Sequence, residues 1–588
     1  MRARGKAVLL LLLVLLVLAL VVVVSMVLVL GGESRVSSPT ILELDLQQSF
    51  PEDVPDGAFA RSLLDGRLRL RRVVETLERA ARDEDVVAIV ARVGAAPMGL
   101  ATAQELRDAM LSFRAGGKKA VAYADTFGEW GPSNAGYYLA TAFEEIHLQP
   151  SGDVGLSGLR YEIPFVADAL DKLGLDAQMD GRHEYKNAIN TYTRTGFTEP
   201  HEEAMQALVD SQFEQLVRGI AEGRSLDPER VRTIFDQGPY FGAEALDAGL
   251  VDRVAYRDEV YTALEEEFGE DVALVELREY ARRGWGSLER SPTVALIYGV
   301  GGVVRGESHY DPFSGPLMGS ETVAGAFRDA IEDPKVRAIL FRVDSPGGSY
   351  IASDTIWRET IRARDAGKPV VVSMGNLAAS GGYFVAMSAD RIVAQPGTIT
   401  GSIGVYGGKI VTRGLWDKLG VSWDSVETSA NARMWSSIEE FGDRGWDRVQ
   451  DSLDRIYGDF VDKVATGRGL SREEAERVAR GRVWTGEKAL ELGLVDVLGG
   501  YPTALAEIRQ ALGLDDEETL KLKIFPRPRS TFELLLDRLP AAGAADPSSR
   551  LVSRWLEITE RLGWIVRSLG LDEGGHLPLR AHDLQESK

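Results

Sequence analysis

One serine and one lysine in this chain lie in sequence contexts that could support hydrolytic chemistry. Ser380 lies in Asn376-Leu-Ala-Ala-Ser380-Gly-Gly-Tyr383, between an apolar stretch and an expected helix. A serine held at such a turn suits a nucleophile, because its hydroxyl lies beside glycines whose backbone amides are bare. The structural alternative for Ser380 is an N-cap, a position that serine also favours.

Lys186 is the candidate base. It lies in Gly181-Arg-His-Glu-Tyr-Lys186-Asn-Ala188, in a chain with 14 lysines against 53 arginines. A solvated surface charge is the ordinary role of a single lysine. Burial can lower the pKa of a lysine amine from about 10.4 towards neutrality and make it a general base, which arginine cannot become.

Two glycines are candidates for stabilising an oxyanion. Gly347 and Gly348 follow the apolar run AILFRV in Val343-Asp-Ser-Pro-Gly-Gly-Ser349. Paired glycines after a strand expose N–H groups and let a substrate backbone approach closely. An ordinary turn is the structural alternative.

Composition excludes several other chemistries. The chain of 588 residues has no cysteine, which rules out cysteine nucleophiles, disulfides and cysteine metal sites. Its six histidines contain no helical metal pair of the H-E-x-x-H kind. Chemistry by a serine and a lysine needs no metal and no cofactor, so neither is expected. The net charge of −22 makes nucleic acid an unsuitable partner. No lysine follows a serine by three positions, which excludes the penicillin-binding type of Ser–Lys site.

The elements that position these residues occur twice. Five blocks recur in the same order with an offset between 244 and 253, for example VVAIVARVGAAP from Val86 and VRAILFRVDSPG from Val336. The sequence therefore predicts a tandem duplication, with one copy at about 39–280 and the other at about 290–500. Short apolar runs alternate with helical stretches in each copy, which indicates βαβ units, a mainly parallel sheet and an α/β class.

The two copies differ at the candidate residues. Asn134 aligns with Ser380, and Lys186 aligns with Ala430. Copy one also lacks the paired glycine of copy two, since it reads Val93-Gly-Ala-Ala-Pro-Met98 there. One copy thus supplies a nucleophile without a base and the other a base without a nucleophile. We therefore expect a single Ser–Lys dyad at the junction of the copies.

The N-terminus predicts a membrane anchor. Residues 7–30 are apolar apart from Ser25, long enough to span a bilayer core of about 30 Å. Arg2, Arg4 and Lys6 precede this span, so residues 1–6 are expected in the cytoplasm and the rest of the chain across the membrane. A cleaved signal peptide is the alternative, although the run is long and lacks an A-x-A site.

The C-terminal extension, residues 501–588, has a different character from the repeats. Residues 550–569 place apolar side chains at helical spacing, which predicts an amphipathic helix. A packing face is the ordinary interpretation of such a stripe, and a membrane-surface helix is the alternative.

Four motifs, LAASGGY, VDSPGGS, TGSIGVYG and EYKNA, resemble those of the signal peptide peptidase A (protease IV) family in its long, duplicated, membrane-anchored form. The resemblance covers about residues 7–500. It implies a Clp protease/crotonase-like fold for each copy and assembly into bowl-shaped homo-oligomers, namely tetramers.

The resemblance also implies roles for individual residues. Ser380 would be the nucleophile and Lys186 the general base, with Ser402 of Thr400-Gly-Ser-Ile-Gly404 hydrogen-bonded to the lysine amine. Backbone N–H groups of the Gly347-Gly348 turn, with Gly381, would bind the oxyanion. The chain departs from the family pattern twice, with Asn187 where serine is common and Asp344 where asparagine is common.

These observations predict a serine endopeptidase of the cytoplasmic (inner) membrane, single-pass, with its catalytic part on the extracytoplasmic side. Its expected substrates are cleaved signal peptides and other membrane-derived peptides. Two alternatives remain at this stage. One is a crotonase-type acyl-CoA enzyme, and the other is a non-catalytic membrane scaffold.

Overall fold

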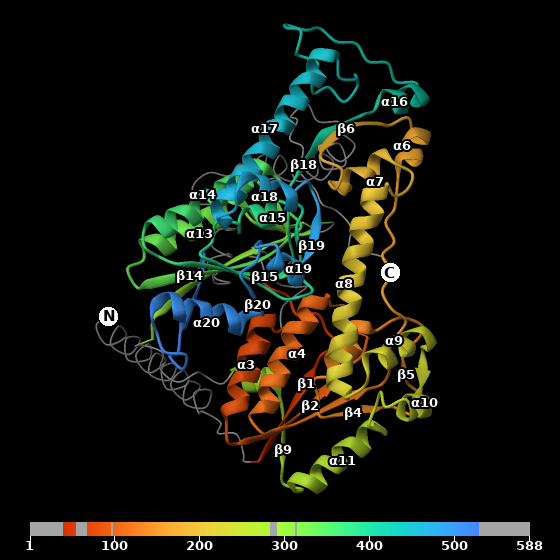
Figure 1. Cartoon of the computed structure of the whole chain (residues 1–588), viewed down its shortest axis with the longest axis vertical. Coiled ribbons are helices and arrows are strands. Elements are labelled where there is room, and N and C mark those ends of the chain that lie inside the picture. The colour runs from red at the N-terminus through yellow and green to blue at the C-terminus, as the bar shows by residue number, and fades with distance from the viewer. Residues whose placement is uncertain (1–38, 54–66, 96–97, 283–290, 312–313, 528–588) are drawn as a thin grey trace, which may run out of the picture.

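A computed structural model describes residues 39–53, 67–95, 98–282, 291–311 and 314–527. In Figure 1 most of the first copy forms the lower part of the molecule and the second copy, green to blue, lies above it, while residues 167–193 of the first copy reach up beside the second. The expected anchor at 7–30, the flank 1–6 and the expected helix at 550–569 fall outside the described residues. Among the residues that are described, no helix has the length and apolar character needed to cross a membrane.

The first copy is built on a six-stranded parallel sheet in the order β8-β4-β3-β2-β1-β9. Its strands are β1 (Thr40–Asp45), β2 (Val86–Arg92), β3 (Lys119–Ala124), β4 (Glu145–Leu148), β8 (Arg253–Val254) and β9 (Ala273–Glu276), and a separate pair is formed by β5 (Asp153–Val154) and β7 (Tyr240–Phe241). Its helices are α3 (Leu70–Arg82), α4 (Leu100–Ala115), α5 (Asn134–Ala140), α6 (Ala167–Leu173), α7 (Asn190–Thr193), α8 (Glu199–Arg224), α9 (Pro228–Gln237), α10 (Gly242–Asp247), α11 (Arg257–Phe268) and α12 (Leu277–Arg282), with one 3-10 turn at Asn187–Ile189.

The second copy repeats this plan with a larger sheet. The main path runs β19-β17-β15-β14-β10-β21, with β16 beside β15 and β20 beside β16. Its strands are β10 (Thr293–Val300), β14 (Val336–Ser345), β15 (Val370–Ala379), β16 (Arg391–Ala394), β17 (Ile399–Gly401), β19 (Val483–Thr485), β20 (Val497–Leu498) and β21 (Lys521–Phe525), with a small sheet of β11 (Gly302–Val304), β12 (His309–Asp311) and β13 (Gly315–Gly319). Its helices are α13 (Ser320–Glu332), α14 (Tyr350–Asp365), α15 (Gly381–Phe384), α16 (Arg413–Leu419), α17 (Asp443–Arg468), α18 (Arg472–Val478), α19 (Gly486–Glu491) and α20 (Tyr501–Leu512).

The central strands are apolar because helices cover both faces of each sheet. Along β14, eight of the ten positions are buried, so the strand reads as a nearly continuous apolar run rather than an alternating one. Separate clusters of buried side chains lie on the two faces of the second sheet. The α/β class and the tandem duplication predicted from the sequence are thus confirmed.

The second copy ends later than the sequence indicated. Strand β21 pairs with β10 just as β9 pairs with β1, and α20 occupies the same place in the order as α11. Residues 501–525 therefore belong to the second copy and not to a separate extension. The repeat was missed there because these segments share helical and strand patterning without sharing residues.

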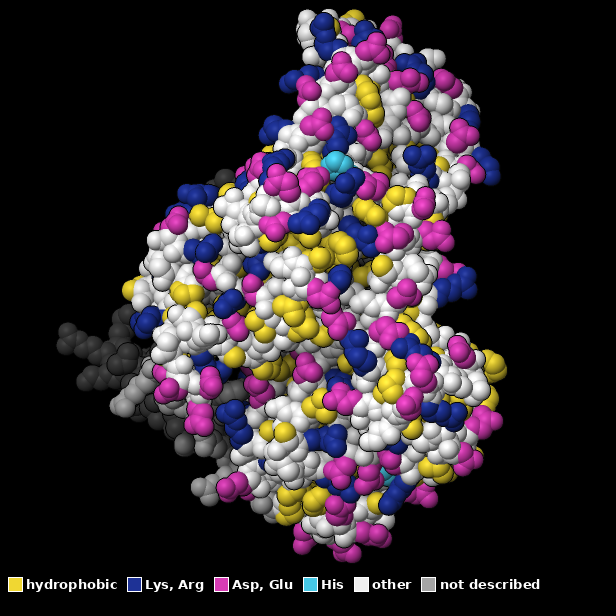
Figure 2. All heavy atoms as spheres, viewed as in Figure 1, with side chains coloured by type: hydrophobic (Ala, Val, Ile, Leu, Met, Phe, Trp, Pro, Cys, Tyr) yellow, Lys and Arg dark blue, Asp and Glu magenta, His cyan; other side chains and the backbone are white. Residues whose placement is uncertain are grey.

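The two copies are joined by an antiparallel ladder and by packed helices. β6 (Asp176–Arg182) of the first copy pairs with β18 (Val405–Val411) of the second along its full length. Helix α4 of the first copy packs against β15, and α8 runs upright beside the second sheet and packs against β19 (Figure 1). On the face shown in Figure 2, acidic and basic side chains are interspersed, and apolar side chains gather where the copies meet.

Candidate active site

The ladder between the copies positions Lys186. Arg182, at the end of β6, pairs with Val405, and the chain then turns back so that the Lys186 N–H donates to the carbonyl of His183 at 3.2 Å. Gly481 packs directly against this turn with a φ of 83°, and a Cβ there would lie 2.5 Å from the Lys186 nitrogen. The lysine is therefore held by strands of both copies and by a glycine of the second.

The Lys186 amine is buried among hydroxyl and carbonyl oxygens. Its Nζ lies 3.1 Å from the Ser380 Oγ, 3.1 Å from the Ser402 Oγ and 2.9 Å from the Ser402 carbonyl oxygen. The residue is only 4% exposed. Burial lowers the pKa of Lys186 from its usual 10.5 to about 7, because a charged amine loses its hydration there. A large neutral fraction can therefore accept a proton near neutral pH.

Ser380 lies at the turn between β15 and α15. Its φ of 53° and ψ of −117° form a strained turn that aims the hydroxyl away from the strand. Ser380 occupies the N-cap position of α15, but its side chain makes no capping hydrogen bond. The hydroxyl is instead directed at Lys186, so the N-cap alternative does not explain this serine.

Ser402 lies at a second strained turn, with a φ of 50°. Its N–H donates to the carbonyl of Arg482 at 2.7 Å, which fixes the turn, and both of its oxygens face the Lys186 amine. The three residues expected to share the site, Ser380, Lys186 and Ser402, are therefore brought together.

The glycines next to Ser380 form a close-packed backbone turn. Gly347 has a φ of 97°, and a Cβ there would lie 2.6 Å from the Gly381 nitrogen and 2.8 Å from the Ser380 Cβ. A Cβ on Gly348, whose φ is 156°, would lie 2.2 Å from the Val303 carbonyl oxygen. No side chain fits at either position, so the backbone itself lines the space beside the hydroxyl.

The amides of this turn are not equivalent. The Gly347 N–H donates to the Ser345 Oγ at 3.2 Å and is therefore engaged. Across the described part of the chain, no acceptor pairs with the N–H groups of Gly348 and Gly381. Of the three amides that the sequence analysis expects at an oxyanion, those of Gly348 and Gly381 are therefore available as donors, and that of Gly347 is engaged by Ser345. The oxyanion role of this turn stays a prediction.

The strand that carries Ser380 bulges three residues before it. The register of β14 with β15 jumps from Val343–Met374 to Ser345–Ala378. Asp344 lies in this gap, and its Oδ1 accepts the N–H of Leu377 at 2.9 Å. Burial, with a smaller contribution from Glu52, raises the pKa of Asp344 from 3.8 to about 6.

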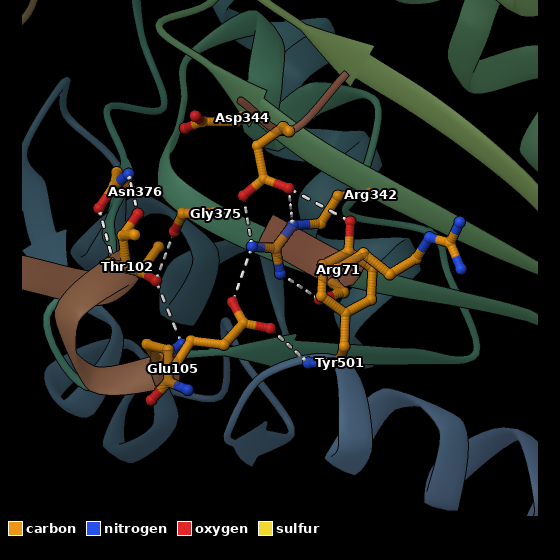
Figure 3. A network of polar contacts seen from close by, with 12 residues as sticks. Arg71, Thr102, Glu105, Arg342, Asp344, Gly375, Asn376 and Tyr501 are labelled. Atoms are coloured by element: carbon orange, nitrogen blue, oxygen red, sulfur yellow. Dashed lines mark hydrogen bonds and ion pairs between the residues drawn. The ribbon is translucent and has the colours of Figure 1, made fainter. Parts of the chain in front are cut away.

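The bulge contacts the first copy through Asn376 (Figure 3). The Asn376 Nδ2 donates to the Thr102 Oγ1 at 2.7 Å, and its Oδ1 accepts the Thr102 N–H at 3.1 Å. A Cβ on Gly99 would collide with the Asn376 side chain, since it would lie 2.1 Å from the Oδ1. Helix α4 of the first copy is therefore seated directly on the strand that leads to Ser380.

A buried ion network lies beside this contact, and sequence analysis did not find it (Figure 3). Arg342 is 1% exposed, and its guanidinium donates to Glu52 at 2.5 and 3.0 Å, to Glu105 at 2.8 Å and to Ser373 at 2.7 Å. The N–H of Tyr501 donates to Glu105 at 2.7 Å. Since Glu52 and Glu105 belong to the first copy, the network fixes one copy to the other.

At the equivalent place in the described part of the first copy, other residue types stand where the second copy has Ser380, Gly348 and Ser402. Asn134 aligns with Ser380, and its amide is bonded within its own copy, to the Gly158 carbonyl at 2.7 Å. Met98 stands opposite Gly348, and Leu156 stands opposite Ser402. Among the described residues, the hydroxyl groups that face the buried Lys186 amine therefore come from the second copy.

Within the described residues, no group of three or more His, Cys, Asp and Glu side chains is placed to hold a metal ion. The chemistry available to Ser380, Lys186 and the neighbouring amides is acyl transfer by a serine with an amine base.

Comparison with known proteins gives matches in both copies. A profile of Peptidase family S49 matches residues 112–271 and residues 362–515. The chain is 29% identical over 512 residues to "Serine protease SPPA, chloroplastic" of Arabidopsis thaliana, which covers 85% of this chain and 73% of that protein.

Two bacterial relatives match over a shorter length. The chain is 33% identical over 412 residues to "Protease 4" of Salmonella typhi and 32% identical over 419 residues to "Protease 4" of Haemophilus influenzae. These alignments cover 68% of this chain and 65% and 66% of those proteins, just under two thirds of their length. Among solved structures, a ClpP1 mutant of Listeria monocytogenes aligns at 14% identity with a TM-score of 0.23, covering 36% of this chain and 94% of that one.

Proposed function

The chain belongs to peptidase family S49, and from this premise we propose that it is a serine protease that uses Ser380 as nucleophile and Lys186 as general base. The observation that supports these roles is the 3.1 Å separation between the Ser380 Oγ and the amine of a buried lysine whose pKa is about 7. Distances of this size are within reach for direct proton transfer.

The proposed reaction begins with neutral Lys186. Its Nζ takes the Ser380 proton as the hydroxyl attacks a peptide carbonyl, and the tetrahedral oxyanion accepts hydrogen bonds from the N–H groups of Gly348 and Gly381. The lysine ammonium then gives its proton to the leaving amine, which leaves an acyl-serine. Water, deprotonated by the same lysine, hydrolyses the ester and regenerates Ser380.

Ser402 is proposed to orient the amine. Both of its oxygens face the Lys186 Nζ, and neither carries a charge. A carboxylate in this place would favour the ammonium and raise the pKa of the lysine, so that less of the amine would be neutral and able to accept a proton near pH 7. The neutral hydroxyl and carbonyl hold the amine in position without that effect.

The proposed substrates are cleaved signal peptides and other apolar, membrane-derived peptides. In support, the chain resembles "Putative signal peptide peptidase SppA" of Enterococcus faecium at 30% identity over 224 residues, 38% of this chain and 65% of that protein. An enzyme anchored by residues 7–30 would meet such peptides where they are released. The proposed location is the cytoplasmic membrane, with the described residues on the extracytoplasmic side.

This location is tested with spheroplasts of cells that produce the full chain. Protease added outside should digest the part of the chain beyond residue 40 while the membrane is intact. Protection of that part until the membrane is permeabilised would overturn the orientation.

A homo-oligomer, namely a tetramer, is also proposed, and sedimentation of the detergent-solubilised full chain tests it. The dyad itself needs no second chain, because Lys186 and Ser380 meet within one polypeptide.

The catalytic assignment is tested with a serine-reactive phosphonate. The unchanged chain should be labelled at Ser380, and the Lys186→Ala variant should be labelled far more slowly, because its serine has lost the base. Ser133→Ala, in the first copy, is the matched control and should be labelled as the unchanged chain is. Labelling at another serine would overturn the assignment.

The same experiment separates this function from the two alternatives. An acyl-CoA enzyme of the crotonase type would bind coenzyme A and leave Ser380 unlabelled. A non-catalytic scaffold would show neither labelling nor peptide hydrolysis. Membership of a peptidase family and the assembled dyad both favour the protease.

A further inference from the structure

A cavity of about 430 Å³ lies between the two copies, at the place in the first copy that corresponds to the catalytic centre of the second. Its wall includes Met98, Asn134 and Ala135, which align with Gly348, Ser380 and Gly381. The first copy therefore has no serine nucleophile at this place but retains a cavity there. The cavity has the size of an ordinary ligand pocket.

The lining of this cavity is apolar in character. Leu100, Leu159, Leu216 and Ile399 contribute to its wall. The polar groups of the lining are already paired with protein partners. Asn134 bonds the Gly158 carbonyl at 2.7 Å, and Tyr161 donates to Gln212 at 2.6 Å.

Asn376, the remaining polar group of the lining, is bonded to Thr102 on both sides of its amide (Figure 3). A ligand therefore finds apolar contact in the cavity and few polar groups in need of a partner. An apolar ligand loses little when it leaves water, whereas a charged ligand would lose its hydration and find few partners in this cavity. An apolar ligand is therefore favoured over a charged one.

The cavity is connected to the dyad by two strands. Leu377 of β15 and Ile399 of β17 line the cavity and pair with each other in the sheet. Ser380 follows Leu377 by three residues, and Ser402 follows Ile399 by three residues. At about 3.3 Å per residue, the cavity lies roughly 10 Å from the nucleophile, a distance that an extended peptide covers in about three residues.

We propose that the degenerate centre of the first copy is a substrate-binding pocket that accepts a large apolar side chain of the peptide, about three or four residues from the bond that Ser380 cleaves. This proposal rests on the proposed function, because it places the occupant relative to the cleaved bond. It assigns the first copy a role in selecting apolar peptides besides supplying Lys186.

The test compares two peptides of equal length that differ at one position. One carries leucine and the other serine at the residue three or four positions from the cleaved bond, and both are hydrolysed by the full chain in detergent. The unchanged chain should prefer the leucine peptide in kcat/KM by about tenfold or more, as burial of one large apolar side chain allows. Ala135→Phe, which fills the cavity, should abolish most of this preference.

Two further variants control for damage to the fold. Ala263→Phe fills a separate cavity of about 300 Å³ beside α11 and should keep the full preference. Leu159→Glu places a carboxylate in the proposed pocket and should reduce binding of the leucine peptide to the inactive Ser380→Ala chain, measured by fluorescence anisotropy. An unchanged preference in Ala135→Phe, or equal binding by the Leu159→Glu chain, would overturn the proposal.

A short activated ester that cannot reach the cavity separates this proposal from the proposed function. Failure of the unchanged chain to hydrolyse the ester would argue against the dyad. Ester hydrolysis without any preference between the peptides would argue against the pocket alone. If Ala135→Phe instead dissociates an oligomer and leaves the peptide preference intact, the cavity is an interface between chains and the proposal is wrong.

Discussion

The side chains of Lys186 and Ser380 lie 3.1 Å apart although 194 positions separate them in the sequence. Each residue comes from a different copy of the duplicated unit, so the site exists only where the copies interlock. The ladder of β6 with β18 and the contact of α4 with the strand bulge before Ser380 are the elements that bring them together. The consequences for catalysis and for stability can be tested separately.

Loss of either member of the dyad should abolish peptide hydrolysis. We expect Ser380→Ala and Lys186→Ala each to lower kcat by at least ~10³-fold, because a nucleophile and its base act as a unit. The double variant should be no slower than the slower of the single variants. Steady-state kinetics on a peptide substrate measures this, with Ser133→Ala as the control that keeps nearly full activity. Full activity in Lys186→Ala would remove lysine from the mechanism.

Activity should rise with pH as Lys186 loses its proton. Its pKa of about 7 in the folded protein predicts a rising limb of kcat/KM with an apparent pKa near 7, and a plateau from about pH 8. Ser402→Ala should lower the rate less than loss of the lysine and leave the limb in place, since the hydroxyl orients the amine. A plateau already reached below pH 6 would indicate a carboxylate or histidine base.

The same burial should make Lys186 costly for stability. Its pKa falls from 10.5 to about 7 on folding, so the unfolded chain binds more protons between these values, and this residue's contribution to stability rises with pH across that window. At and below pH 7 the cost is about 5 kcal/mol, at about 1.36 kcal/mol per pKa unit.

Lys186→Met should therefore raise the melting temperature at pH 7. The gain is reduced by the loss of the hydrogen bonds that the amine makes. The difference should shrink towards pH 10.5. Differential scanning calorimetry at a series of pH values measures it. A lower melting temperature of the Lys186→Met chain at pH 7 would contradict the conclusion that burial lowers the pKa of Lys186 at a cost in stability.

The duplicated fold and the dyad could be predicted because both leave local signals. Apolar runs and repeated blocks predicted a sheet in each of the two copies. The differences between the copies indicated Ser380 and Lys186 as candidate site residues. The roles of Ser402 and of the glycine amides came from family resemblance. Three-dimensional geometry then distinguished Gly348 from Gly347, since the engagement of one amide by the Ser345 hydroxyl has no sequence pattern.

What could not be predicted depends on contacts between distant segments. The network of Arg342 with Glu52 and Glu105 joins three segments of unrelated pattern. The pairing of β21 with β10 likewise joins an edge strand to a strand that is distant in the sequence. Charged residues in a sequence are ordinarily solvated, so burial of an arginine with two carboxylates cannot be recognised without the fold.

Asp344 predicts a second pH-dependent contribution to stability, opposite in sign to that of Lys186. Its pKa is raised from 3.8 to about 6, so the folded chain binds more protons than the unfolded chain between these values, and the contribution falls as pH rises through this window. Above pH 6 the buried charge costs about 3 kcal/mol.

Asp344→Asn keeps an oxygen to accept the Leu377 N–H and removes the charge, so it should raise the melting temperature at pH 8 and have little effect at pH 4. Calorimetry at these two values measures the difference. Equal effects at both pH values would show that folding does not raise the pKa of this carboxyl group.

Arg342 predicts how strongly the copies are held together. Its guanidinium, 1% exposed, pairs with Glu52 and Glu105, and burial already raises the pKa of Glu105 despite that pairing. Arg342→Met leaves two buried carboxylates without their cation, and we expect a loss of about 3–5 kcal/mol at pH 7. The loss should be smaller at pH 4, where protonation removes the uncompensated charge.

Arg92 offers a matched control for this substitution, because it occupies the position in β2 that Arg342 occupies in β14. Its side chain is 48% exposed and pairs with Asp125 at the surface, so Arg92→Met should cost no more than about 1 kcal/mol. Hydrogen exchange with mass spectrometry should show where the structure loosens. Arg342→Met should increase exchange in α4 and in the bulge before Ser380, whereas Arg92→Met should leave both segments protected. Equal destabilisation by the two substitutions would mean that the buried network does not join the copies.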